Sequence, residues 1–435
     1  MARSTDRLPT KRVLVVGNGG REHALVRSLL HSPQQPEVLA APGNAGIAKD
    51  RVPCIAARAE DVKAIVRSAR KERCDLVVVG PEAPLVAGLV DALDEAGISA
   101  FGPSAAAARL EGSKAYAKEL MRAVGVPTAA YEVVHGRDEA LRALNETAYP
   151  VMLKADVLAA GKGVLICRSE QEALAAIDML FVRRRFGDTP VVIEEFLDGE
   201  ELSLLALCDG ERALAMMPAQ DYKRIFDGDE GPNTGGMGSY SPVPGIDSDH
   251  AALLARLVHQ PVVDELRRRG TPYHGVLYAG LMMTAGGPRV LEYNCRFGDP
   301  ETQAVLPRLR SDLVDVLERC VRFGGLRGTE LEWASEWAVT VVLAARGYPD
   351  SPSLGDPITG LSAIDSLDTE VLHAGTAERE GRFVTAGGRV LNVTGFASTP
   401  DQARERAYAG AERIRFPGRQ MRRDIAARAV DRVEV

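Results

Sequence analysis

The chain has 435 residues, which is longer than one hydrophobic core usually serves and predicts two to four domains. Hydrophobic residues make up 46% of the chain and charged residues 26%. Its 53 basic and 60 acidic residues give a net charge of −7, and the dispersed lysines and arginines form no basic tract of the kind that binds nucleic acid. No apolar run reaches the roughly 18 residues that span a bilayer, and six separated cysteines without a C-x-x-C pair argue against a zinc site or a disulfide scaffold. We therefore expect a cytoplasmic protein with no nucleic-acid or membrane partner.

The first hundred residues alternate between predicted strands and helices. The runs RVLVVG (12–17), EVLAA (37–41) and DLVVVGPE (75–82) are short, apolar and rich in β-branched residues, as buried strands are. Strands that alternate with helices form a parallel, doubly wound sheet. Residues 11–112 are therefore predicted to form an N-terminal doubly wound domain.

The rest of the chain divides into a helix, a small lobe, a loop and a last domain. A helix is predicted over 111–127, and the apolar segments between about 128 and 205 indicate a small, sheet-rich lobe. The stretch 220–244 is so rich in glycine, proline and aspartate that we expect a long functional loop instead of regular structure. A new run of strands and a closing helix predict a C-terminal domain over 332–430.

The glycine turn GNGGREHA (17–24) does not fit a dinucleotide site. Glu22 stands where the third glycine of such a fingerprint is needed, and the second strand ends without an acid for a ribose. The turn can still hold a phosphate or carboxylate on its free N–H groups and Arg21, although an empty tight turn is an equal alternative. A site is favoured because two further loops follow strands at the same sheet edge, PGNAG (42–46) and GPEAPL (80–85).

The stretch VMLKADVLAAGKGV (151–164) is glycine-rich but is no Walker loop, because no hydroxyl follows its glycine and lysine to hold magnesium. Its two lysines, Lys154 and Lys162, join Lys114 at the edges of one predicted nucleotide cleft. A single lysine is usually a solvated surface group. Three at one cleft, two of them in segments where a ligand can approach the backbone, are better interpreted as phosphate ligands.

The segment VVIEEFLDGEELSLLAL (191–207) has two interpretations. It can be an ordinary strand with a charged turn. It can also be a hinge between lobes, in which the backbone at Phe196 and Leu197 and the carboxylate of Glu194 bind an adenine while Glu201 binds ribose hydroxyls. The neighbouring motifs favour the hinge.

The strongest single motif is VLEYNCRFGDPETQ (290–303). On a strand, Glu292, Asn294 and Arg296 alternate by two and therefore project from one face. A carboxylate and an amide oxygen suit magnesium, and a neighbouring arginine suits a phosphate. The alternative, a polar strand face in contact with solvent, does not explain the acids and amides of the Gly-Asp-Pro turn that follows.

Several strings taken in order resemble the phosphoribosylamine–glycine ligase family, also called glycinamide ribonucleotide synthetase. The resemblance runs from about residue 11 to about 425 and rests above all on GPNTGGMG and NCRFGDPETQ. In chain order, the matching strings are GNGGREHA, APGNAG, VGPEAPL, FGPSAAAARLEGSKAYAK, LKADVLAAGKGV, VIEEFLDGEE, QDYKR, GPNTGGMGSYSP, YAGLM, EYNCRFGDPETQ and HAGT. The resemblance implies a multidomain α/β and α+β protein with an N-terminal doubly wound parallel sheet, a two-lobed ATP-grasp core over 113–328 and a C-terminal α/β domain.

The resemblance also implies a reaction. Glycine is activated by ATP to a glycyl phosphate, which the amine of 5-phosphoribosylamine attacks to give glycinamide ribonucleotide, ADP and phosphate, a step of de novo purine biosynthesis. Magnesium or manganese is the implied metal, the implied partners are these small molecules, and the implied state is a monomer or weak homodimer. No enzyme nucleophile is needed, since positioning and charge stabilisation suffice.

Carried onto this chain, the resemblance implies residue roles. The implied catalytic residues are Arg296, Lys154 and Asp221, and the implied metal ligands are Glu292 and Asn294. The implied ATP-binding residues are Lys114, Lys154, Lys162, Gly161, Gly163, Glu194, Phe196, Leu197 and Glu201. The implied binding residues for glycine and the acceptor are Gly19, Arg21, Glu22, Asn44, Asp221, Lys223, Arg224, Gly236 and Arg296.

One position departs from the family's motif, which usually has glycine where residue 157 is valine. A β-branched residue would be strained there if the loop needs a positive φ. Three alternatives stay open: an ATP-grasp ligase with another acid or amine, an inactive nucleotide-binding homologue, and, more distantly, a hydride-transfer enzyme that Glu22 already opposes.

Overall fold

The N-terminal part is a parallel sheet covered by helices, as predicted. The computed structural model describes residues 10–145, 147–158, 163–364 and 368–433. Its first sheet has the strand order β2-β1-β3-β4. Strand β1 is central, since it pairs with β2 on one side and β3 on the other, and all but its first residue are buried. The strands are β1 (Arg12–Gly17), β2 (Glu37–Pro42), β3 (Leu76–Val79) and β4 (Ser99–Phe101). The helices are α1 (Gly20–Leu30), α2 (Ala45–Lys49), α3 (Val62–Lys71), α4 (Glu82–Val86), α5 (Leu89–Glu95) and α6 (Ala105–Gly112).

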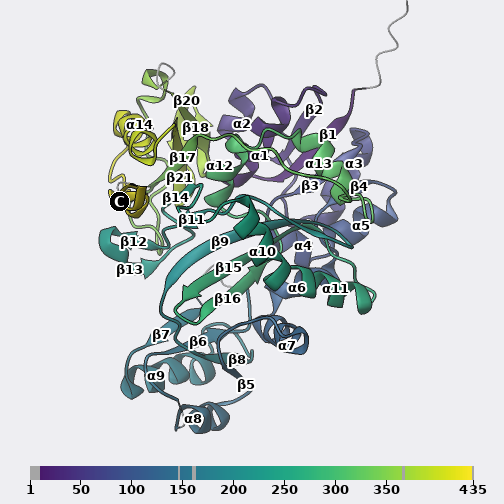
Figure 1. The fold of residues 1–435 in the computed structure, drawn as a ribbon. Coiled ribbons are helices and arrows are strands. Elements are labelled where there is room, and N and C mark those ends of the chain that lie inside the picture. Colours follow the sequence, from purple (N-terminus) through teal and green to yellow (C-terminus); the bar gives the residue numbers. More distant parts are fainter. Residues whose placement is uncertain (1–9, 146, 159–162, 365–367, 434–435) are drawn as a thin grey trace, which may run out of the picture.

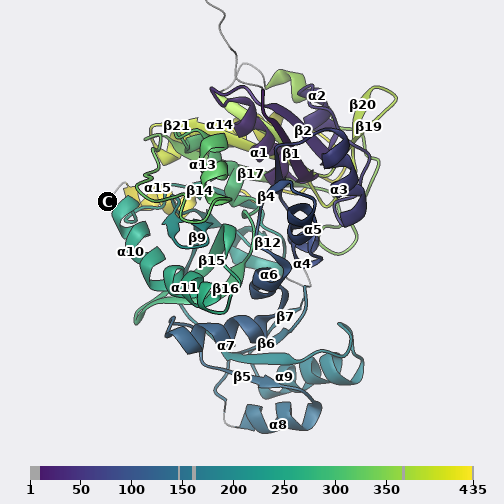
Figure 2. The same cartoon turned by 90° about the vertical axis from the view of Figure 1, so that its right-hand side faces the viewer.

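The small lobe is an antiparallel sheet with its own hydrophobic core, and it stands apart at the bottom of Figures 1 and 2. Helix α7 (Lys114–Val124) leads into it and ends at Gly125, whose φ of +71° suits glycine. The strand order is β5-β8-β6-β7. The elements are β5 (Tyr131–Val134), α8 (Arg137–Asn145), β6 (Val151–Ala155), β7 (Val164–Cys167), α9 (Glu170–Ile177), a π-helical turn (Asp178–Val182) and β8 (Val191–Glu195).

The large lobe is built on a second antiparallel sheet with the order β10-β9-β15-β16. The long pairing of β9 with β15 runs from Asp209 and His274 to Glu200 and Met283. Because β8 continues through residues 196–199 into β9, the two lobes are joined by a short connection. The elements are β9 (Glu200–Asp209), β10 (Ala213–Ala215), α10 (Ser248–Val258), α11 (Gln260–Arg268), β15 (His274–Thr284), β16 (Gly287–Asn294), α12 (Glu301–Val305), a 3-10 turn (Leu306–Arg308) and α13 (Leu313–Cys320).

The last sheet crosses the predicted domain borders. Its order is β11-β14-β17-β21-β18, so two strands from the stretch 220–244 belong to it: β11 pairs with β14, and β14 pairs with β17, more than ninety residues later. The prediction that 220–244 has no regular structure was therefore wrong. The elements are β11 (Gln220–Asp221), β12 (Arg224–Phe226), a 3-10 turn (Asp227–Asp229), β13 (Glu230–Asn233), β14 (Gly238–Ser241), β17 (Trp337–Ala344), a 3-10 turn (Leu361–Ala363), β18 (Thr369–His373), β19 (Thr376–Arg379), β20 (Arg382–Thr385), β21 (Arg389–Ala397), α14 (Pro400–Arg413) and α15 (Ala427–Val433).

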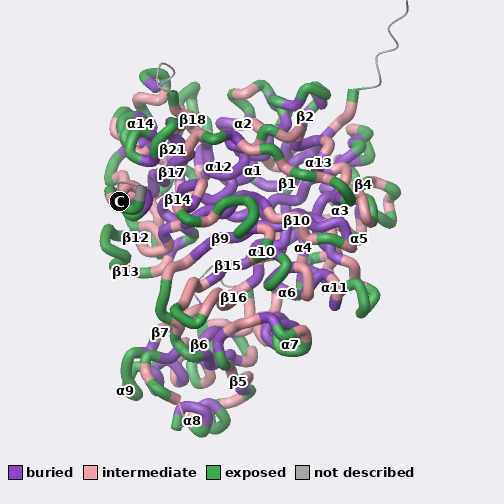
Figure 3. Tube along the Cα trace, viewed as in Figure 1, coloured by how far each residue is buried: buried purple, intermediate pink, exposed green. Residues whose placement is uncertain are grey.

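Buried residues follow the sheets, and exposed residues gather on the outer helices and the loops (Figure 3). One continuous core includes β1, β3, β9, β15, β17 and β21, whereas the small lobe packs separately. Among the described residues no helix combines the length and the apolar character needed to cross a membrane.

Candidate active site

A cavity of ≈ 720 Å³ lies between the two lobes and is also lined by residues of α1, α4 and α6 from the N-terminal part and by Arg389 and Arg428 from the C-terminal part. Helices, antiparallel strands and connecting loops contribute to its wall. The predicted residues that line it are Arg21, Lys114, Lys154, Gly163, Glu194, Phe196, Leu197, Glu201, Asp221, Lys223, Arg224, Glu292, Asn294 and Arg296. The structure thus brings together side chains from positions 21 to 296.

The remaining predicted residues lie elsewhere. Gly19, Glu22, Asn44 and Gly236 are outside the cavity wall, although Gly235 belongs to it. Gly161 and Lys162 lie outside the described residues. Contact of these six with substrates or ATP stays a prediction.

Glu22 stabilises the first glycine turn. Its carboxylate accepts a hydrogen bond from Gly19 N–H at 2.6 Å and from Arg21 Nε at 2.5 Å. It also occupies the space above Gly17 and Gly80, at the carboxyl ends of β1 and β3, where a Cβ on either glycine would collide with it. This crevice is the usual ligand position in a doubly wound sheet, and here a side chain fills it. Arg21 remains in the cavity wall and donates to the carbonyl of Phe297 at 3.1 Å.

Asn44 joins the N-terminal part to the last sheet. Its Oδ1 caps α2 by accepting from Gly46 and Ile47 N–H, and its Nδ2 donates to the carbonyls of Asn18 and His373, at 2.9 and 2.8 Å. These four bonds use the amide fully. The structure therefore gives Asn44 a positioning role at this junction.

A buried cluster of lysines and one acid lies on the small-lobe side of the cavity. Lys154 Nζ on β6 is 2.8 Å from Glu194 Oε2 on β8, and Lys118 Nζ lies 3.0 Å from the same oxygen. Burial lowers the pKa of Lys118 to about 8 despite that carboxylate. The other oxygen, Glu194 Oε1, is buried and has no hydrogen-bond partner among the described residues, so it is able to accept from a ligand N–H.

Lys118 was not predicted, although its spacing from Lys114 gave a signal. The two lysines are four residues apart on α7 and therefore share one helix face. Lys114 Nζ donates to the carbonyls of Ala155 and Val157, at 3.0 and 2.8 Å. Burial lowers the pKa of Lys114, although nearby acids oppose this effect. Lys114 thus holds the start of the glycine-rich loop against the first turn of α7.

Val157 carries no left-handed strain. It is not among the described non-glycine residues with positive φ. Next to it, Asp156 accepts hydrogen bonds from Ser113 Oγ at 2.9 Å and Ala115 N–H at 3.1 Å. Valine is therefore compatible with the backbone conformation at position 157, and the strain of a positive φ does not arise at this residue.

The alternating motif starts on β16 and continues beyond the last residue of that strand, Asn294, with the predicted orientation. Glu292, Asn294 and Arg296 line the cavity, whereas Tyr293 and Cys295 are buried behind them, although Tyr293 also reaches the wall. Burial alone would raise the pKa of Glu292, but Lys223, Lys154 and Lys114 hold it below its usual range. Glu292 is therefore an ionised oxygen donor beside an amide.

Two acids from the N-terminal part orient Arg296. Its Nε donates to Glu82 at the start of α4, at 3.2 Å, and its Nη2 pairs with Glu111 at the end of α6, at 3.2 Å. Glu111 also accepts from Cys295 N–H at 2.7 Å and Sγ at 3.1 Å. These acids raise the pKa of Arg296 although burial acts against them. Neither acid was predicted to contact Arg296, because they lie about 190 to 210 residues before it in the chain.

A second group of charged side chains in the cavity wall lies on β9, on β11 and just after β11. Lys223 forms an ion pair with Glu201, and Asp221 lies beside them in the wall. Burial, assisted by the nearby acids including Glu301, raises the pKa of Asp221 to about 8, although Lys223 acts against this shift. Glu301 was not predicted; it accepts from Ser203 Oγ at 3.0 Å. A titrating carboxyl in a cavity is typical of a functional site.

Arg389 on β21 brings the C-terminal part into the cavity. Its guanidinium donates to the carbonyls of Gly235 and Asp299, at 2.5 and 2.6 Å, and pairs with the Asp299 carboxylate at 3.2 Å. It thereby fixes the glycine loop against the Gly-Asp-Pro turn. Nothing in the local sequence RVLNVTG marked this residue, because its partners lie about 90 and 150 residues earlier.

The donor set fits a divalent metal that is shared with phosphates. Among the described residues no three His, Cys, Asp or Glu side chains form a closed metal cluster. Magnesium in phosphate-transferring sites typically takes only one or two protein oxygens and completes its shell with phosphates and water. Glu292 and Asn294 supply two such oxygens toward the cavity.

Comparison with known proteins identifies the family of this chain. Family models match it in three consecutive parts, namely the N domain (11–111), the ATP-grasp (A) domain (112–302) and the C domain (338–428) of phosphoribosylglycinamide synthetase. The phosphoribosylamine–glycine ligase of Streptomyces coelicolor is 50% identical over 422 residues, which cover 96% of this chain and 99% of that protein. The chain belongs to the phosphoribosylglycinamide synthetase family.

Other members agree with this assignment. The phosphoribosylamine–glycine ligase of Ralstonia nicotianae is 46% identical over 428 residues, 97% of this chain and 100% of that protein. The crystal structure of the Thermotoga maritima phosphoribosylamine–glycine ligase superposes with a TM-score of 0.82 at 38% identity and covers 95% of this chain and 100% of that one. The predicted family and its architecture of a doubly wound sheet, ATP-grasp core and C-terminal domain are confirmed.

Membership of the phosphoribosylglycinamide synthetase family makes the chain an ATP-grasp ligase, which uses ATP and a divalent metal ion. The predicted borders 11–112, 113–328 and 332–430 stay predictions. The pairing of β14 with β17 shows that the last two parts share a sheet.

Proposed function

We propose that the chain joins glycine to 5-phosphoribosylamine, with ATP becoming ADP and phosphate, and releases glycinamide ribonucleotide. The observation that carries the proposal is the composition of the cavity wall. Arg21 from the N-terminal part and Arg389 from the C-terminal part line the same cavity as the ATP-grasp residues Lys154 and Glu292. A site built from all three parts agrees with family matches that extend over all three.

The chemistry follows from the charges. A glycine carboxylate is a poor electrophile, so a phosphoryl group is first transferred to it and phosphate then leaves as the amine attacks. We assign Lys114 and Lys154 to neutralising phosphate oxygens, and Arg296, which contacts Glu82 and Glu111, to stabilising the charge on the transferred group. An acyl phosphate hydrolyses in water, which is consistent with a site enclosed between two lobes.

The acceptor and glycine are assigned to the opposite wall. Asp221 and Lys223, with Arg224, lie there beside the glycine loop at Gly235. We assign recognition of the anionic substrate groups to Lys223 and Arg224, because opposite charges pair most strongly where water is excluded. We assign recognition of the amine to the Asp221 carboxyl, whose raised pKa a bound ammonium group would lower, so that the two form an ion pair.

For the metal we propose magnesium, held by Glu292 and Asn294. Hard oxygen donors favour magnesium, and manganese accepts the same ligands. A bound ion would withdraw negative charge from the phosphates of ATP. The monomeric or weakly dimeric state and the cytoplasmic location remain predictions.

The test is ADP release with magnesium, ATP, glycine and freshly generated phosphoribosylamine, each omitted in turn, followed by mass analysis of the product. We expect release to require all three substrates and the product to be glycinamide ribonucleotide. Release with another acid or amine, but not with this pair, would support a different ATP-grasp ligase. ATP binding without any release would support an inactive homologue.

A further inference from the structure

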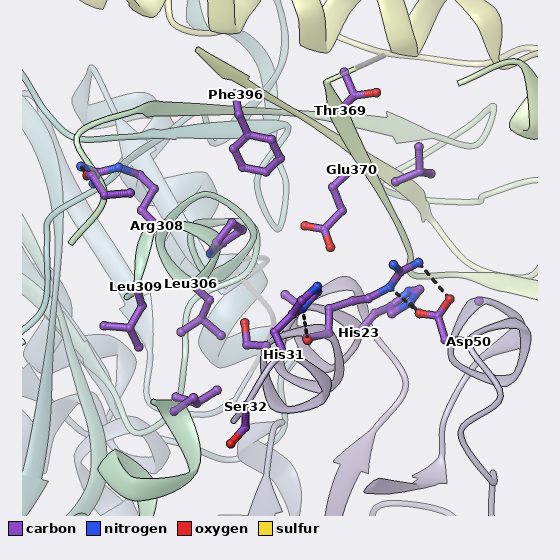
Figure 4. Close-up of a pocket in the computed structure, with 18 of the residues that line it drawn as sticks. His23, His31, Ser32, Asp50, Leu306, Arg308, Leu309, Thr369, Glu370 and Phe396 are labelled. Carbon is purple, nitrogen blue, oxygen red and sulfur yellow. Dashed lines mark hydrogen bonds and ion pairs between the residues drawn. The ribbon is translucent and has the colours of Figure 1, made fainter. Parts of the chain in front are cut away.

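The structure has a second cavity, of ≈ 670 Å³, which Figure 4 shows. It is lined by α1 and the residues that follow it, by β18, by Phe396 of β21, and by the chain around residues 306–313. It shares no lining residue with the active-site cavity. Its volume falls in the range of roughly 300–1,000 Å³ that is usual for small-molecule sites.

Two arginines of this second cavity have partners within the chain. Arg27 Nη2 donates to Asp50 at 2.9 Å. Arg308 is buried and donates to the carbonyls of Glu336 and Ala334, at 2.7 and 3.0 Å. These two guanidiniums are therefore held by the protein and are not free to bind a polyphosphate.

Glu370 on β18 is different. Its carboxylate points into the middle of the second cavity (Figure 4), and no hydrogen bond or ion pair joins it to any other residue in the described ranges. Burial raises the pKa of Glu370, while the nearby Arg27 and His31 act against that shift. A half-buried carboxylate without a hydrogen-bond donor is costly, and a ligand that supplies N–H groups removes this cost.

An aromatic ring stands beside this acid. Glu370 pairs in register with Thr394 on β21, so Phe396, two residues further, lies on the same sheet face. Its ring projects into the cavity, and Leu306 and Leu309 line the facing wall (Figure 4). A slot with a ring on one side, aliphatic side chains on the other and one carboxylate at its end suits a flat group.

We propose that the second cavity binds a small planar heterocycle that presents two adjacent N–H donors, as 2-amino-substituted heterocycles and amidines do. The two donors pair with the two oxygens of Glu370, and the ring lies between Phe396 and Leu309. This site is independent of the reaction assigned above, so either can fail without the other.

The test is isothermal titration of the protein with 2-aminobenzimidazole while a non-hydrolysable ATP analogue saturates the active site. We expect binding to the unaltered chain and at least about tenfold weaker binding to Glu370→Gln, which keeps the shape but loses the charge-assisted bonds. Phe396→Leu, which keeps an apolar side chain but removes the ring, is expected to weaken binding as well. Benzimidazole, which lacks the second donor, is expected to bind at least about tenfold more weakly than its 2-amino derivative.

Glu378→Gln is the matched control, because Glu378 lies on β19 of the same domain, is exposed and is not part of the cavity wall. It is expected to bind the probe normally. Thermal melts verify that each variant is folded. Absence of binding to the unaltered chain, or equal binding to Glu370→Gln, would overturn the proposal.

Discussion

Gly236 allows the sharpest test of how the glycine loop supports the active site. Its φ is +106°, and a Cβ at this position would overlap Pro300 Cδ in the Gly-Asp-Pro turn. Alanine therefore costs about 1–2 kcal/mol for its backbone conformation and about 1–3 kcal/mol for overpacking. The carbons cannot approach so closely, so the turn that carries Asp299 and Glu301 must move by about 1 Å.

A shift of about 1 Å at an active site lowers turnover by about a hundredfold, and we expect this for Gly236→Ala. Gly245→Ala is the matched control, since Gly245 also has a positive φ, +79°, but a Cβ there meets nothing within 4 Å. It should lose about 1–2 kcal/mol of stability and keep its turnover. The assays are urea unfolding and ADP release. If Gly236→Ala matched Gly245→Ala in both assays, the proposed contact between loop and turn would be wrong.

Three further predictions concern the metal, the loop and a buried histidine. Glu292→Gln should lower kcat by at least about a hundredfold, since the charged ligand of the proposed metal ion is lost; unchanged activity at limiting magnesium would contradict the metal assignment. Val157→Gly should change the KM for ATP less than about twofold, because no left-handed strain is relieved, and a tenfold change in steady-state kinetics would show that the valine matters. Burial lowers the pKa of His259 to about 4, below its unfolded value of about 6.5. The unfolded chain therefore binds more protons between these values, and the chain should lose about 3 kcal/mol of stability as the pH falls from 6.5 to 4. His259→Leu should abolish this part of the pH dependence. The measurement is the unfolding free energy from urea titrations between pH 6.5 and 4, and an equal loss of stability in both proteins would refute the prediction.

Local patterns in the sequence were sufficient for the elements whose partners lie close in the chain. The apolar run at 12–17 is strand β1, and the period of two in Glu292, Asn294 and Arg296 gives one cavity-facing row. Both depend only on side-chain alternation and burial, which are written in consecutive residues.

Long-range pairing was not visible in the sequence. The stretch 220–244 contains strands because β14 pairs with β17, whose nearest residue in register, Ala338, lies 97 positions after Ser241. Likewise, Glu22 replaces a glycine because its carboxylate fills the crevice between β1 and β3. A distant partner satisfies the backbone or fills the space in both cases, and no local propensity encodes that.

The three-part wall of the active site has a consequence for the order of synthesis. A ribosome delivers Lys154 and Glu292 well before Arg389 and Arg428, yet all four line one cavity. A growing chain can thus form both lobes of the clamp while the glycine loop still lacks the guanidinium that fixes it. We expect the enzyme to gain its activity only late in translation, when the last sheet has formed, so that unfinished chains do not consume ATP.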